Sequence, residues 1–254
     1  METGIAGLAG WLFVGLVAAL GVLVIRGVSR ALRRQYDAPT ALRGKLLVRA
    51  GLLLWLGLTA TLAATGQLSD FGARPPRLLL LLLPPLGLAF WLARSAAVGR
   101  LLNAVPRSGL IYLQSCRVVV EVVLWLLFLG GAVPVQMTFE GLNWDVLTGL
   151  TAPLAAYFCF RAGHQHWKAA LAWNLLGLAL LLNIVTIAML SAPMPIRQFF
   201  NEPANTVITH FPMIWLPTFV VPLAYCLHVL SIRQLWRLRK TGAQQALKPV
   251  VAAA

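Results

Sequence analysis

The chain has 254 residues, of which 59% are hydrophobic and 11% are charged, and its formal net charge is +14. Soluble domains carry about 25% charged residues, so this composition excludes an ordinary soluble globular protein. The positive charge does not indicate nucleic-acid binding, because the basic residues stand between long apolar runs and form no single basic face.

Seven apolar segments follow one another along the chain. A membrane-spanning helix needs about 20 mostly apolar residues, and the fifth segment is the shortest of the seven. The segments predict an all-α fold, a polytopic bundle of seven transmembrane helices. They are Ile5–Ile25, Leu46–Gly66, Leu78–Val98, Ile111–Gly131, Val146–Arg161, Ala169–Leu190 and Pro212–Ile232. We expect one transmembrane domain, 1–240, followed by a flexible cytoplasmic tail of small and polar residues, 241–254.

The distribution of basic residues predicts the orientation of the bundle. The first segment follows Glu2 and precedes several arginines, which is the reverse of a signal peptide, so we expect it to be retained. Eighteen basic residues fall on the side of the first loop and the C-terminus, and three, Arg74, Arg77 and Arg197, fall on the other side. The positive-inside rule then places the N-terminus outside and the C-terminus in the cytoplasm. The stretch Arg26–Arg49 is expected to anchor this topology in the lipid bilayer or, alternatively, to attract anionic lipids.

The fourth segment carries three polar side chains inside an apolar run. Gln114, Arg117 and Glu121 follow at steps of three and four residues, which places them on one face of a helix. A charge at this depth is costly and normally faces the protein interior or a water-filled cavity. With the span taken as 111–131, Glu121 lies at its midpoint, and Arg117 is close enough to reach its carboxylate.

Two later segments carry polar side chains at a similar depth. Asn174 and His228 lie about 8 Å and about 9 Å to the cytoplasmic side of the middle of their spans. We therefore expect Arg117, Glu121, Asn174 and His228 to form one buried ligand-binding cluster, with Gln114 at its inner edge. The alternative is a local Arg117–Glu121 pair that neutralises itself and fixes helix packing, with Asn174 and His228 bonded elsewhere.

Two connections on the predicted outer side mix acids, amides and aromatic residues. The first reads VPVQMTFEGLNWD and the second SAPMPIRQFFNEPANTVITHFP. Such loops either bind a small polar ligand or a cation, or cap the bundle as ordered structure. Their candidate ligand-binding residues are Glu140, Asn143, Asp145, Asn205 and His210.

No motif for catalysis, metal binding or phosphate binding occurs. The chain has no HExxH, no EF-hand loop, no Cys pair, no Gly-rich phosphate loop and no GxSxG elbow. These motifs would mark an enzyme, so an enzymatic function is not favoured, and we assign no catalytic residue, no metal ligand and no cofactor.

Two stretches of the chain resemble a known family. They are TFEGLNWD with the following LTGLTAP, and FFNEPANTVITHFPMIWLPTFVVPLA. In them the chain resembles an uncharacterised family of bacterial multi-pass membrane proteins with seven spans. The resemblance implies a location in the bacterial inner membrane and attaches no function.

The polar face of the bundle predicts a protein that binds or transports a small molecule. The alternative is a seven-helix receptor or assembly subunit with no transport activity. A carrier needs a polar site that reaches the midplane, whereas a receptor needs a pocket on the outer side and an assembly subunit needs a flat helix face for its partner. The sequence assigns no coupling ion and no oligomeric state.

Overall fold

The structure, a computed structural model, describes residues 2–73, 77–161 and 166–251. Throughout these ranges the regular structure is helical, and short 3-10 and π segments join the α-helices. This confirms the predicted all-α class. Arg74, one of the three basic residues expected on the outer side, lies outside the described ranges.

Among the described residues, six helices are long and apolar enough to cross a membrane, and one further apolar helix is shorter. The long helices are α1 (Glu2–Gln35), α2 (Ala38–Ala64), α3 (Arg77–Arg94), a fourth span (Arg107–Leu129), α8 (Trp167–Ser191) and α9 (Val221–Val251) with the π-helical segment η5 (Leu216–Val220) before it. The fourth span consists of α5 (Arg107–Tyr112), the 3-10 segment η1 (Leu113–Ser115) and α6 (Cys116–Leu129). The shorter apolar helix is α7 (Val146–Phe160), and the remaining elements are α4 (Ala96–Leu102), η2 (Val135–Met137) and η4 (Val207–Thr209).

Each of the seven predicted segments overlaps one of these apolar helices, which is the architecture of a multi-pass membrane protein. The helix α7 has 15 residues, about 22 Å at 1.5 Å per residue, which is less than the roughly 30 Å of a bilayer core. The helix α9 continues to Val251, and the flexible tail expected from 241 stays a prediction.

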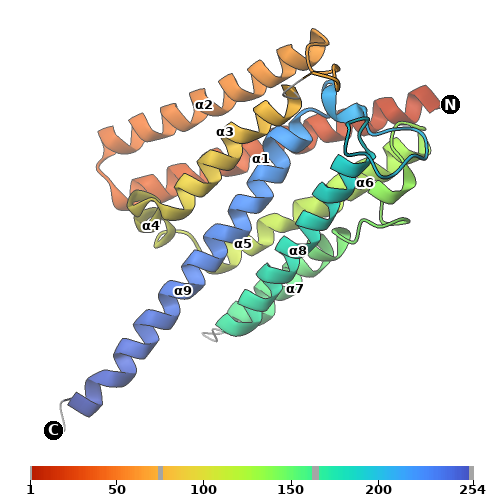
Figure 1. Cartoon of the computed structure of the whole chain (residues 1–254). Helices are drawn as coiled ribbons and strands as arrows, with labels where there is room; N and C mark the ends of the chain where they lie inside the picture. Colours follow the sequence, from red (N-terminus) through yellow and green to blue (C-terminus); the bar gives the residue numbers. More distant parts are fainter. Residues whose placement is uncertain (1, 74–76, 162–165, 252–254) are drawn as a thin grey trace.

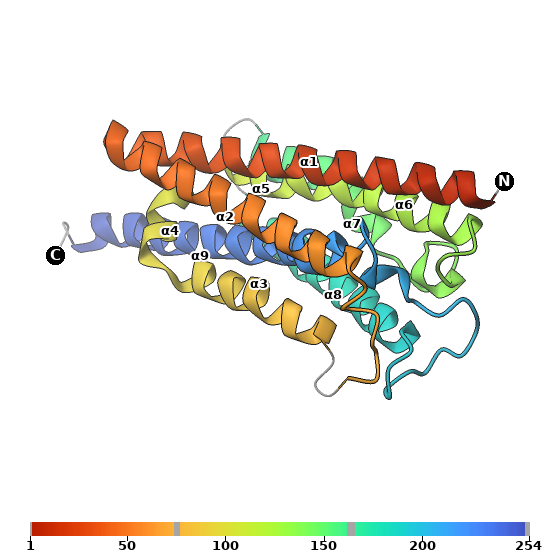
Figure 2. The same cartoon turned by 90° about the horizontal axis from the view of Figure 1, so that it is seen from above.

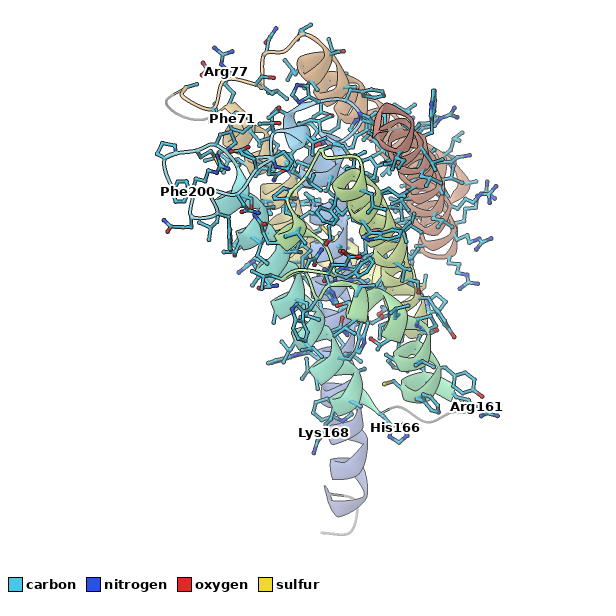
Figure 3. The ribbon with its side chains drawn as sticks, turned by 90° about the vertical axis from the view of Figure 1, so that its right-hand side faces the viewer. Phe71, Arg77, Arg161, His166, Lys168 and Phe200 are labelled. Atoms are coloured by element: carbon cyan, nitrogen blue, oxygen red, sulfur yellow. The ribbon has the colours of Figure 1, made fainter. Side chains whose placement is uncertain are left out.

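The connections between the helices alternate between the two ends of the bundle (Figures 1 and 2). The N-terminus shares one end with the segments that precede α3, α7 and η5, whereas the α1–α2 turn, α4 and the C-terminus lie at the other end. Figure 3 shows the same division, with Phe71, Arg77 and Phe200 at one end and Arg161, His166 and Lys168 at the opposite end.

The main hydrophobic core lies between α1, α6, α8 and the start of α9. Phe13 and Val17 of α1 pack in it with Val123 of α6, Leu181 of α8 and Ala224 of α9. The helices α2 and α3 lie outside this core and bury few of their apolar side chains. In a bilayer such surfaces contact lipid, so their exposure agrees with a membrane protein and not with a water-soluble one.

Local sequence signals end and begin several helices. Gly66 after α2 and Gly131 after α6 have φ angles of 70° and 67°, a left-handed conformation that glycine adopts at low cost. These two glycines are the predicted ends of the second and fourth segments. At the start of α2, the Asp37 carboxylate accepts a hydrogen bond from the Thr40 N–H at 3.4 Å.

Prolines make the beginning of the last span irregular. Pro217 lies within η5, and Pro222 lacks the N–H that would bond the carbonyl of Thr218, four residues earlier. In hydrocarbon a freed carbonyl needs a partner from a neighbouring helix. Trp55 of α2 supplies it, because its indole Nε1–H donates to the Thr218 oxygen at 2.9 Å.

Replacing Trp55 with phenylalanine should therefore destabilise the protein by about 1–3 kcal/mol, the cost of leaving a buried acceptor without a partner. The measurement is the free energy of unfolding of the purified protein in detergent. Trp11→Phe is the matched control, because the Trp11 side chain is 78% exposed on α1. Equal effects of the two substitutions would contradict this role of Trp55.

Candidate functional site

A buried polar cluster occupies the centre of the bundle. It contains seven residues from the fourth span, the segment before α7, α8 and α9, and we call it the Arg117 cluster. Each of these side chains is at most 5% exposed. Its members are Arg117, Glu121, Asn143, Asp145, Asn174, His228 and Ser231.

Arg117 forms its ion pair with Asp145 and not with Glu121. Its Nε lies 2.7 Å from Asp145 Oδ2, and both side chains are almost completely buried. Its Nη1 lies 3.4 Å from the Gly177 oxygen and 3.0 Å from His228 Nε2. The predicted local pair with Glu121 is therefore wrong, because a carboxylate from a different segment takes the place next to the guanidinium. Arg117 is buried inside the bundle and does not lie in a loop, so it no longer counts among the basic residues that predict the orientation. The comparison then becomes 17 basic residues on one side against three on the other.

The hydrogen bonds of His228 determine its tautomer. A guanidinium can only donate, so His228 Nε2 must accept from Arg117, and the proton of the imidazole lies on Nδ1. Nδ1–H then donates to Asn174 Oδ1 at 3.0 Å. The Asn174 amide in turn donates to Ser231 Oγ at 3.1 Å and to the Ala170 oxygen at 2.8 Å. Arg117, His228, Asn174 and Ser231 thus form one chain of hydrogen bonds across the fourth span, α8 and α9.

Glu121 joins the cluster through Asn143. The Asn143 amide donates to Glu121 Oε2 at 2.6 Å and to the Met137 oxygen at 3.0 Å. Asn143 Oδ1 accepts from the backbone N–H of Asp145 at 3.1 Å. Asn143 therefore connects the carboxylate of Glu121 to the loop that positions Asp145.

The segment between Gly131 and α7 folds back into the bundle, which corrects the expected position of Asn143 and Asp145. We expected both in an outer loop, but Arg117, the partner of Asp145, lies about 18 Å from the end of the span at Leu129. The span begins at Arg107, four residues earlier than expected, so its middle lies nearer Arg117 than Glu121. The helix α7 consequently begins near the middle of the bundle, which explains its short length.

Two glycines allow the helices to approach closely at the cluster. A Cβ on Gly177 of α8 would lie 2.8 Å from His228 Nε2 and 3.0 Å from Thr148 Cγ2. A Cβ on Gly149 of α7 would lie 2.7 Å from the backbone N of Val118. Small residues commonly serve this purpose between membrane helices.

Several buried polar atoms at the cluster have no hydrogen-bond partner. Two belong to the ion pair itself, Arg117 Nη2 and Asp145 Oδ1, and a third is the Thr148 hydroxyl in the first turn of α7, which lies next to the Asp145 carboxylate. Gln114 is buried three residues before Arg117, where its amide donates to the Ala224 oxygen of α9 at 3.1 Å and its Oε1 has no partner. The cluster therefore combines satisfied bonds with open donor and acceptor positions.

The remaining predicted residues lie apart from the cluster. Glu140 is exposed and accepts from Trp125 Nε1 at 2.7 Å, and His210 is exposed with its Nδ1 3.1 Å from the Thr206 oxygen. Asn205 is buried and donates to the Ala188 oxygen of α8 at 3.0 Å. These three residues are not brought together in one site.

The loops before α7 and after α8 are ordered at the end of the bundle that they share. Gln136 donates to Ser191 Oγ at 3.0 Å, and Asn201 donates to Gln136 Oε1 at 2.8 Å, so the loops before α7 and after α8 are tied together. Arg197 hydrogen-bonds Glu202 at 2.9 Å and thereby lowers the pKa of the Glu202 carboxyl. Within the described ranges, no group of three His, Cys, Asp or Glu side chains is placed to hold a metal ion.

Three contributors to the cluster were missed from the sequence. Ser231 follows His228 by three residues and Gly177 follows Asn174 by three, so helical spacing places each on the polar face of its helix. That signal was available. Thr148 was not recognisable, because its position depends on the fold of the loop before α7.

Comparison with known families and proteins gives one match. A family model described as a domain of unknown function (DUF8737) matches residues 75–236, the part of the chain from the start of α3 to α9. No curated protein and no solved structure matches the chain. The prediction of a family with no attached function is thereby confirmed, and the chain belongs to the family of the domain of unknown function DUF8737.

Proposed function

We propose that this protein is an integral membrane protein that binds or carries a small polar molecule at the Arg117 cluster. The observation that supports this function is the pair of open atoms on one buried ion pair, Arg117 Nη2 and Asp145 Oδ1. Buried polar atoms are nearly always hydrogen-bonded, so both positions call for a further group. One is a donor and the other an acceptor, which suits a hydroxylated, amide-containing or zwitterionic molecule.

The start of α7 supports a site of this kind. Transporter sites often lie at the membrane midplane, where a helix is interrupted and its end points at the ligand. Here Asp145 immediately precedes the first turn of α7, and that turn carries the partial positive charge of a helix N-terminus. The site thus combines a guanidinium, a carboxylate and a helix end at one depth.

The charge asymmetry supports an orientation for this site. With 17 basic residues on one side of the predicted topology and three on the other, we place the N-terminus outside, the C-terminus in the cytoplasm and seven crossings between them. The membrane is then the inner membrane of a bacterium, as the resemblance implies.

A ligand screen on the purified protein tests the proposal. Small amino acids, polyols and amides are added at millimolar concentration, and the thermal unfolding midpoint is recorded. At a hundred times its Kd, a true ligand adds about 2.7 kcal/mol and raises the midpoint by roughly 5–10 °C. In Glu121→Gln the affinity for the ligand should fall about tenfold or more. The reason is that Asn143 loses its charge-assisted hydrogen bond to Glu121, and Asn143 in turn holds the backbone of Asp145 in position.

Glu140→Gln is the matched control, since Glu140 is an exposed carboxylate that also accepts one side-chain bond. It should leave the ligand shift unchanged. A screen without any shift, or a shift that survives in Glu121→Gln, would refute binding at the cluster.

The complete burial of the cluster favours a second candidate, a receptor or assembly subunit in which the network fixes helix register. Glu121, Asn174 and His228 are each at most 1% exposed, so the described conformation offers no route for solute past them. Uptake of a labelled hit compound into proteoliposomes separates the two functions. A carrier accumulates the compound, whereas a receptor binds it without transport.

A further inference from the structure

A groove of about 370 Å³ runs along α9, away from the Arg117 cluster. Its lining residues belong to the part of α9 that runs past α4 towards the C-terminus (Figure 2). Its lining residues recur at steps of three and four, so they form one face of the helix. They are Val229, Ile232, Arg233, Trp236 and Arg237, three apolar side chains and two guanidinium groups.

Neighbouring helix ends hold the two guanidinium groups in place. Arg233 donates from Nη1 to the Leu92 oxygen at 3.0 Å and from Nη2 to the Ser95 oxygen at 2.9 Å, at the end of α3. Arg237 donates to the Gly99 oxygen of α4. Cations at helix C-termini are favourable, so these contacts account for where the arginines lie. A guanidinium carries five N–H donors, more than the two carbonyls bonded to Arg233 use.

The two guanidinium groups meet beside Gly99. A Cβ there would lie 2.6 Å from Arg233 Nη2 and closer still to Arg237 Nη2, so only glycine leaves room for both. Among the described residues at this end of the bundle, Asp37 is the acidic one, and its carboxylate caps the first turn of α2. Two neighbouring positive charges are thus held at one point of the groove.

We propose that this groove binds one anionic phospholipid. Its phosphate lies between Arg233 and Arg237, because the fork of a guanidinium matches phosphate oxygens, and its acyl chain runs along Val229 and Ile232. Trp236 is 55% exposed at the same groove, in the amphipathic position that tryptophan favours at a membrane interface. Basic pockets between helices on the cytoplasmic side bind acidic headgroups in this way.

The test uses the full chain in nanodiscs and the fluorescence of Trp236. The chain has nine tryptophans, so the Trp236 signal is the difference between the native protein and Trp236→Phe. Brominated phosphatidylglycerol should quench this signal far more than brominated phosphatidylcholine at the same fraction of lipid. The preference for phosphatidylglycerol is the ratio of the quenching by the two brominated lipids. In Arg237→Gln this ratio should fall about fivefold, because one basic residue contributes about 1 kcal/mol to binding at an anionic membrane surface.

Two further variants keep the result interpretable. Arg30→Gln removes an exposed arginine of α1 at the same end of the bundle and should leave the preference intact. Gly99→Ala keeps both charges but displaces the guanidinium groups, and it should lower the preference even if Arg237→Gln does not fold. Equal quenching by the two lipids in the native protein overturns the proposal. So does an equal loss in Arg30→Gln and Arg237→Gln, which would indicate general surface charge.

Discussion

Asp145→Asn is expected to destabilise the protein by about 3–5 kcal/mol, the largest effect of any conservative substitution considered for this chain. The reason is that Arg117 then remains buried without its counter-ion, and removing one partner of a buried pair costs this much. Asparagine has nearly the shape of aspartate, so the loss arises from charge and not from packing. The measurement is the free energy of unfolding in mixed detergent micelles.

Two further variants separate the causes of this effect. Glu202→Gln breaks the ion pair with Arg197, in which the Glu202 side chain is 70% exposed, and it should not change stability measurably. The double variant Arg117→Met with Asp145→Leu should recover much of the loss, because no charge is then left buried. If Asp145→Asn were as stable as the native protein, Arg117 could not depend on this carboxylate.

Gly177→Ala is expected to destabilise the protein by about 1–3 kcal/mol, although alanine is the better helix former. The new methyl group would lie 2.8 Å from His228 Nε2, so it pushes the imidazole away from Arg117 and Asn174. The measurement is again the free energy of unfolding in detergent.

Gly57→Ala is the matched control, because nothing lies within 4 Å of a Cβ at this position of α2. It should stabilise the protein slightly, by up to about 1 kcal/mol. A second comparison uses His228→Ala. In that background Gly177→Ala should cost much less, since neighbouring substitutions are not additive. Full additivity would show that the two residues do not compete for the same space.

The long apolar helices could be predicted from the sequence because lipid imposes a length and a composition on each crossing. Gly66 and Gly131 marked two helix ends to within two residues, since their left-handed conformation is one that other residues adopt at a cost. The contact of His228 with Arg117 and Asn174 agrees with their similar predicted positions along their helices, because helical rise converts residue number into distance.

The partner of Arg117 could not be predicted in the same way. Asp145 lies in an irregular segment, and irregular backbone has no fixed rise that would relate residue number to depth. Arg117 and Glu121 are neighbours on the helix, as their i, i+4 spacing requires, but the Asp145 carboxylate lies closer to the guanidinium of Arg117. The same irregular segment brought Asn143 to Glu121, whereas Glu140 stayed at the surface.

The late position of Asp145 in the chain has a consequence for membrane insertion. Arg117 precedes its counter-ion along the chain and reaches the bilayer ahead of it, and an arginine at the centre of a lone helix costs about 2.5–3.5 kcal/mol. The helix α7 is too short to be retained well by its own hydrophobicity. The fourth span needs the carboxylate of Asp145, and α7 needs the fourth span as a packing partner. We therefore expect the two segments to be stable in the membrane only after both have been inserted.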